Sequence, residues 1–184
     1  MKSNNEVGRW FIKSAMCKSM LALGVWISVM NTAVAMKVAG TDVVVGETTL
    51  EEIEEDYKVD DDLEYSITGD TGRRINGKEN NIPNTGFIRF FFNDENIVTG
   101  AAALIKKDQI PVLESEFGEK YKKPEGDMPT PMIKRRNVNV FLKDNVHVIT
   151  ATDDRFYGAI LFYRTREFTR KAYAEMRKRE RENQ

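Results

Sequence analysis

The fold is decided by Phe87-Ile-Arg-Phe-Phe-Phe-Asn-Asp-Glu-Asn-Ile-Val98 and by a second stretch, Asn137-Val-Asn-Val-Phe-Leu-Lys-Asp-Asn-Val-His-Val-Ile-Thr150. Each stretch consists of a strand, a polar turn and a second strand, which predicts a β-hairpin. Each also follows an amphipathic helical stretch, so the pattern indicates one helix-plus-hairpin unit written twice. We therefore predict an α+β fold with an antiparallel sheet covered by two or three helices. Residues 36–107 form the first unit of one compact domain and residues 108–184 the second.

Three helices are predicted from capping residues and apolar spacing. Thr49, followed three residues later by Glu52, has the form of a capping box and begins a helix over 47–57. Asp108 is a suitable N-cap for the second helix. The third begins near Thr165 and ends in a polar tail that we expect to fray.

The first strand of the first hairpin, residues 87–92, is apolar on both faces apart from Arg89. This pattern predicts a central strand that is covered on two sides. Shorter strands are predicted at 42–46 and 63–68, and a further apolar strand at 156–163 leads into the last helix.

Two polar connections interrupt these elements. Residues 69–86 are rich in glycine and asparagine, and residues 122–131 contain three prolines and one glycine. Such sequences are typical of exposed loops, and binding residues are often found on loops. We therefore expect functional residues in these two connections.

Residues 1–35 have the layout of a secretory signal peptide. An apolar run over 20–30 follows basic residues and precedes Ala33-Val-Ala35, which matches an A-x-A cleavage site. We predict cleavage after Ala35, which gives a periplasmic or secreted protein that begins at Met36.

The alternative is an uncleaved anchor, because the apolar segment 19–35 approaches the roughly 17–25 residues that span a bilayer. Only in that case would the protein contact a membrane. The single cysteine, Cys17, precedes the apolar run, so the mature chain would contain no disulfide.

Several catalytic and metal-binding patterns are missing or lack their usual context. Asp70-Thr71-Gly72 matches the aspartic-peptidase triplet, but it lies in a polar stretch without a second copy, so a turn explains it better. The acidic cluster over 56–64 lacks the spacing of an EF-hand. The only histidine, His147, lies in an alternating strand, where a surface or half-buried ring is expected. We therefore expect no catalytic residue, no metal and no cofactor.

Charge gives little reason to expect a nucleic-acid partner. The net charge is -1, and the basic stretch 164–182 has eight Lys or Arg interspersed with four Glu. We interpret this stretch as an ordinary charged helix.

Gly46-Glu-Thr-Thr-Leu-Glu-Glu-Ile-Glu-Glu-Asp-Tyr57, followed by a hairpin, resembles the glycine, threonine, helix and two-strand pattern of the BamE (SmpA/OmlA) envelope proteins. The doubled arrangement is similar to the β-lactamase inhibitor protein family, which has two such units in tandem. The chain departs from the envelope family in lacking a lipidated cysteine. The resemblance implies an exported, non-catalytic protein that binds other proteins through a sheet surface and loops.

The predicted function is an exported protein-binding module, such as an inhibitor, an immunity protein or an envelope-associated protein. A hydrolase that acts on cell-wall or extracellular substrate through paired carboxylates is the alternative. Exposed aromatic residues at Phe141, Tyr157 or Tyr163 would favour binding. The candidate binding residues are Arg73, Arg74, Asn76, Lys122, Lys123, Tyr157 and Tyr163.

Overall fold

The computed structural model describes residues 36–61, 63–124, 137–152 and 158–183 of the 184-residue chain. Met36–Gln184 forms a unit of its own. The predicted signal peptide lies outside the described residues, and so does Tyr157.

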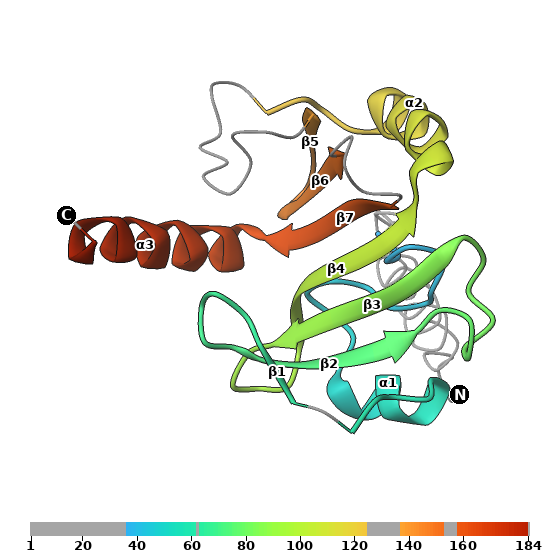
Figure 1. The fold of residues 1–184 in the computed structure, drawn as a ribbon, viewed down its shortest axis with the longest axis horizontal. Helices are drawn as coiled ribbons and strands as arrows, with labels where there is room; N and C mark the ends of the chain where they lie inside the picture. The colour runs from blue at the N-terminus through green and yellow to red at the C-terminus, as the bar shows by residue number, and fades with distance from the viewer. Residues whose placement is uncertain (1–35, 62, 125–136, 153–157, 184) are drawn as a thin grey trace, which may run out of the picture. The chain divides into compact units, whose positions relative to one another are not determined.

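A seven-stranded antiparallel sheet runs through this unit in the order β1-β2-β3-β4-β7-β6-β5 (Figure 1). The strands are β1 (Glu64–Tyr65), β2 (Thr71–Asn76), β3 (Thr85–Phe92), β4 (Val98–Lys106), β5 (Asn137–Lys143), β6 (Val146–Thr152) and β7 (Gly158–Thr165). The helices are α1 (Leu50–Asp56), α2 (Ile110–Lys120) and α3 (Arg166–Glu182), with a 3-10 turn at Lys107–Gln109 before α2. The predicted α+β class and antiparallel sheet are confirmed.

The sheet joins strands from both predicted units. The two hairpins that define the sequence pattern are confirmed as β3-β4 and β5-β6. β4 then pairs with β7, from Gly100 opposite Arg164 to Lys106 opposite Gly158. This long-range pairing brings the strands of both units into one continuous sheet.

The prediction of an irregular connection over 69–86 was wrong. β2 lies within it and pairs with β3, from Gly72 opposite Phe91 to Asn76 opposite Phe87. Ile75 is the one large apolar side chain of this strand, so no hydrophobic alternation marked it in the sequence. A strand can form here because its partner β3 supplies the hydrogen bonds and the apolar surface.

Two shorter predicted strands also differ from the structure. The strand expected at 63–68 is limited to Glu64–Tyr65. The segment expected to form a strand at 42–46 instead folds back on itself through an isolated bridge between Lys37 and Val44. Positive φ angles at Ala39 and Gly40 accommodate this tight reversal.

The capping box of α1 is confirmed. The Thr49 hydroxyl accepts a 3.3 Å hydrogen bond from the Glu52 backbone N–H, and the Glu52 carboxylate accepts a 2.8 Å bond from the Thr49 N–H. The predicted cap of the second helix was wrong. Asp108 lies inside the 3-10 turn, and Gln109 occupies the N-cap of α2 without a side-chain hydrogen bond.

α3 begins where the sequence predicted it. Thr165 caps the helix, and its side chain accepts a 3.1 Å hydrogen bond from the Phe168 N–H. The helix continues to Glu182, so the expected fraying of its tail is not seen. Among the described residues, no helix combines the length and the apolar character needed to cross a membrane.

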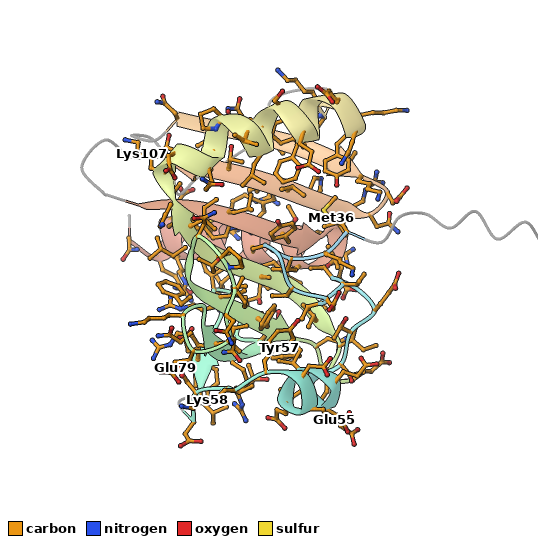
Figure 2. All side chains as sticks on the ribbon, turned by 90° about the vertical axis from the view of Figure 1, so that its right-hand side faces the viewer. Met36, Glu55, Tyr57, Lys58, Glu79 and Lys107 are labelled. Atoms are coloured by element: carbon orange, nitrogen blue, oxygen red, sulfur yellow. The ribbon has the colours of Figure 1, made fainter. Side chains whose placement is uncertain are left out.

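One face of the sheet carries the hydrophobic core. Figure 2 shows three elements in front of the strands on this side, from top to bottom: helix α2, the segment that begins at Met36, and helix α1. Ile53 of α1 and Phe117 of α2 are buried in the same cluster as the strand residues. The strand residues with no exposed surface in this cluster are Ile75, Ile88, Phe90, Val98, Ala103, Val148 and Leu161.

Candidate functional site

The opposite face of the sheet carries a set of half-buried apolar side chains, together with Ile149 and Ala151 of β6, which are each 2% exposed. On β3, Phe87 and Phe91 alternate with the core residues Ile88 and Phe90, so they lie on the second face. The same alternation continues across β4, β7, β6 and β5. We call this surface the open face. Its half-buried apolar residues include Phe87, Phe91, Leu104, Val140, Ile160 and Phe162.

α3 lies on one end of the open face. Phe168 packs over Gly100, where an added Cβ would meet the phenyl ring at 3.1 Å. The same ring lies 6.0 Å from that of Phe91, measured between centroids. After Ala172 no side chain of α3 is buried, so within the described residues this helix covers only part of the face.

Two glycines lie directly beside large side chains of the open face. A Cβ at Gly72 would approach the Phe91 ring to 2.9 Å, and a Cβ at Gly158 would approach Leu104 Cδ1 to 2.7 Å. Both substitutions would push the neighbouring side chain outward. The two glycines thus leave room for Phe91 and Leu104 close to the backbone of the neighbouring strand.

An ion-pair cluster lies at the β1-β2-β3 end of the open face. The Arg74 Nε lies 2.5 Å from Asp60 Oδ2, and its Nη1 lies 3.7 Å from Glu64 Oε1. The Arg89 Nε lies 2.7 Å from Glu64 Oε2, although this nitrogen is not aligned for a hydrogen bond. Arg89 also lies 5.0 Å from the centroid of the Phe87 ring. Both arginines are therefore neutralised locally by carboxylates.

A third arginine on the open face, Arg164, has a different environment. Its guanidinium lies 4.5 Å from the Phe162 ring centroid and 6.0 Å from the Phe168 centroid. Burial lowers the pKa of Arg164, although the proximity of Tyr173 opposes this shift. Within the part of the chain that the structure describes, no carboxylate forms an ion pair with it.

His147 lies directly across from Arg164 in the β6-β7 pairing. Its Nδ1 lies 3.2 Å from the Thr169 hydroxyl oxygen. Burial lowers the pKa of His147, and the positive charges of Arg166 and Arg164 lower it further. The half-buried ring expected from the sequence is confirmed, and it is held in the neutral form at the α3 end of the open face.

The candidate residues of β2 have mainly structural contacts. Arg73 points to the core side and lies 3.7 Å from Glu54, whereas Arg74 belongs to the ion-pair cluster on the open face. Asn76 closes the turn after β2, where its side chain accepts hydrogen bonds from the N–H groups of Lys78 and Glu79.

The other candidates lie elsewhere. Lys122 and Lys123 follow α2, and Lys122 forms a backbone bridge to Leu142 of β5. Four strands separate β5 from β2 in the sheet, so these lysines and the β2 residues do not form one site. Tyr163 is 2% exposed and points into the core, so the exposed aromatic residue expected there is not found. The same applies to Phe141, which is also 2% exposed.

The open face was not predicted as a site from the sequence. Its signal was present in residues 87–92, which are apolar on both faces, but we interpreted this as a strand covered on both sides. Burial of Ile88 and Phe90 confirms one covered side. Phe87 and Phe91 occupy the other side, where α3 covers only one end.

The described residues give no support for carboxylate catalysis. Asp60 and Glu64 both contact Arg74, and the Glu114 carboxylate accepts hydrogen bonds from Thr150 and Asn139. In that part of the chain no cluster of three or more His, Cys, Asp or Glu side chains could hold a metal ion. Asp70 accepts a hydrogen bond from Thr68 in the turn before β2, in agreement with a turn role for this aspartate.

The resemblance to BamE-like and β-lactamase inhibitor proteins rests on residues 46–57 and on the hairpins. α1 and its capping box form within this segment. No protein-family model, curated protein or solved structure matches the chain.

Proposed function

We propose that this protein is an exported, non-catalytic binding module, and that the open face is the surface on which it binds another protein. The observation that carries the proposal is the set of half-buried phenyl and aliphatic side chains on the face opposite the core. Contiguous apolar surface of this kind is typical of interaction sites in soluble proteins.

The chemistry of the open face supports a protein partner. Arg89 stacks on Phe87 and Arg164 stacks on Phe162, and arginine and aromatic side chains are enriched at the centres of protein interfaces. Phe91 and Leu104 belong to the face of a sheet, which fits a macromolecular partner better than a small molecule, because small molecules bind in concave sites. The partner class is an enzyme that the module inhibits or a component of the cell envelope.

Export is supported by the pattern of residues 1–35, which combines basic residues, an apolar run and Ala33-Val-Ala35. Cleavage would release a chain that begins at Met36. N-terminal sequencing of the protein recovered from its native host tests this part of the proposal. A protein that retains the apolar run would contradict cleavage and favour the anchor.

Site-specific photo-crosslinking in the native host tests the binding surface. A benzophenone amino acid replaces Phe162 on the open face in one variant and Val112 on α2 in the control. Val112 is 64% exposed but lies on the helix that packs against the core side. We expect a discrete adduct with one partner protein from position 162 and none from position 112. Equal crosslinking at both positions, or none at 162 and at a second open-face position, Val140, would overturn the proposal.

A further inference from the structure

Among the described residues, one arginine of the open face has no carboxylate close enough for an ion pair. Three arginines lie on this face, and two of them, Arg74 and Arg89, are within 2.7 Å of Asp60 or Glu64. Arg164 differs, because among the described residues its recorded close contacts are phenyl rings and not carboxylates. The open face therefore combines apolar side chains with a guanidinium that forms no ion pair within the described part of the chain.

A cation in this position is costly without an anionic partner. Arg164 extends along Phe162 and Phe168, so its stem and guanidinium are shielded from much of the solvent. This desolvation lowers the pKa of the guanidinium, which means that the charged form is disfavoured in this environment. A stacked guanidinium keeps its in-plane N–H groups free to bind a carboxylate in a bidentate manner.

The carboxylate nearest in sequence to Arg164, that of Glu167, forms an ion pair with Lys171, and the two titratable rings beside Arg164 are neutral. His147 faces Arg164 across the β6-β7 pairing, and its ring is neutral because burial and two arginines lower its pKa. Arg166 lies at the start of α3 and is the second arginine that acts on this ring. The phenolic group of Tyr173 is also neutral, because burial raises its pKa. Arg164 and Arg166 therefore place two positive charges beside the neutral His147 ring, which favours an acidic partner.

We propose that the protein segment bound on the open face carries an Asp or Glu side chain that pairs with Arg164, flanked by apolar side chains that cover Phe162 and its neighbours. This inference rests on the proposed function and specifies the chemistry of the partner. Apolar contacts across the sheet supply most of the affinity, and the carboxylate sets the register and selects against neutral or basic segments.

A displayed random-peptide library selected on the immobilised full chain tests the inference. We expect the enriched peptides to share an Asp or Glu between apolar residues. One selected peptide is then synthesised with Glu or with Gln at that position, and binding is measured by fluorescence polarisation. We expect the change to Gln to weaken binding at least about tenfold, as is typical of hydrogen bonds to charged groups. This comparison alters nothing in the protein, so it holds even if an arginine variant misfolds.

Protein variants locate the contact. Arg164→Gln should weaken binding of the Glu peptide at least about tenfold and leave binding of the Gln peptide nearly unchanged. Arg170→Gln is the matched control, because Arg170 is an exposed residue of α3. Ile160→Lys reports whether a peptide uses the open face at all.

The possible outcomes separate the two proposals. One outcome is that selected peptides bind the wild type but not Ile160→Lys. If their binding needs no Asp or Glu, or is unchanged by Arg164→Gln, this result would overturn the carboxylate inference and support the docking surface. If no selected peptide depends on Ile160, or none is enriched, both the inference and the docking surface fail. Acid-dependent binding that Arg164→Gln abolishes and Arg170→Gln does not supports both.

Discussion

The Tyr163 hydroxyl oxygen accepts a 3.1 Å hydrogen bond from the backbone N–H of Ala39, 124 residues earlier in the chain. Tyr163 is 2% exposed, and burial raises the pKa of its hydroxyl, which therefore stays protonated. Ala39 has a φ of 41°, in the tight reversal before α1. This bond ties the N-terminal segment of the described chain to the centre of the sheet.

Tyr163→Phe should destabilise the fold because the Ala39 N–H would lose its acceptor in a part-buried place. We expect a loss of about 1–3 kcal/mol in the free energy of unfolding, measured by urea denaturation. Tyr57→Phe is the matched control, since Tyr57 accepts a 2.9 Å bond from the Asp42 N–H in an exposed place. Water can replace that acceptor, so the control should cost much less. Equal losses in both variants would contradict the role of burial.

Thr49→Ala should shorten or loosen α1, because this seven-residue helix depends on its capping box. We expect a loss of about 1 kcal/mol, with the same unfolding measurement. Glu52→Gln retains an acceptor for the Thr49 N–H and should have a small effect, whereas Glu52→Ala should resemble Thr49→Ala. A large loss in Glu52→Gln would show that the charge matters more than the hydrogen bond.

The same substitution should have opposite effects at two glycines. Gly100→Ala places a methyl group 3.1 Å from the Phe168 ring and should destabilise the contact of α3 with the sheet by about 1–3 kcal/mol. Gly118 lies in α2, and a Cβ added there would meet no atom of the described residues within 4 Å beyond its chain neighbours and the helix backbone. Gly118→Ala should therefore stabilise the protein by about 0.5–1 kcal/mol, because alanine has the higher helix propensity. Circular dichroism melts of both variants test the signs. A stabilising Gly100→Ala would mean that Phe168 does not press on this position.

His147 should make stability depend on pH. Its pKa is lowered in the folded protein by burial and by Arg166 and Arg164, so below about 6.5 the unfolded chain binds a proton that the folded chain resists. The contribution of the neutral His147 ring to the free energy of unfolding is therefore fully present above about pH 6.5. It is lost as the pH falls from about 6.5 through the lower pKa of the folded protein.

His147→Gln should remove that part of the pH dependence. Urea unfolding of both proteins at pH 5 and pH 7.5 measures the difference, and the wild type should lose more stability between these two values. If both proteins lose the same amount, the His147 ring does not carry the pH dependence.

Local sequence signals predicted the elements that depend on neighbouring residues. The capping box of Thr49 and Glu52, the N-cap at Thr165 and both hairpins form as expected. In each case the interacting groups lie within a few residues of one another, so spacing and residue type are sufficient. Asp108 shows the limit of this reasoning, because a suitable capping residue was present but the chain formed a 3-10 turn there.

The candidate site could not be derived in the same way. The sequence identified 69–86 as a loop because β2 has little apolar alternation, and that strand forms through its pairing with β3. The choice of Tyr163 as an exposed aromatic residue failed because the segment around Ala39 covers it. The formation of β2 and the burial of Tyr163 both depend on contacts with other segments of the chain, which local sequence patterns do not reveal.

The sequence by itself determined the α+β class and the antiparallel hairpins, and its N-terminal pattern is the basis of the proposed export. Only the tertiary structure decided that β4 pairs with β7 and that the core lies on one side of the sheet. The alternation of side chains in a strand divides residues between two faces but does not say which face is covered. The helices and the N-terminal segment cover Ile88 and Phe90, whereas alternation places Phe87 and Phe91 on the opposite face, where Phe168 of α3 lies 6.0 Å from Phe91.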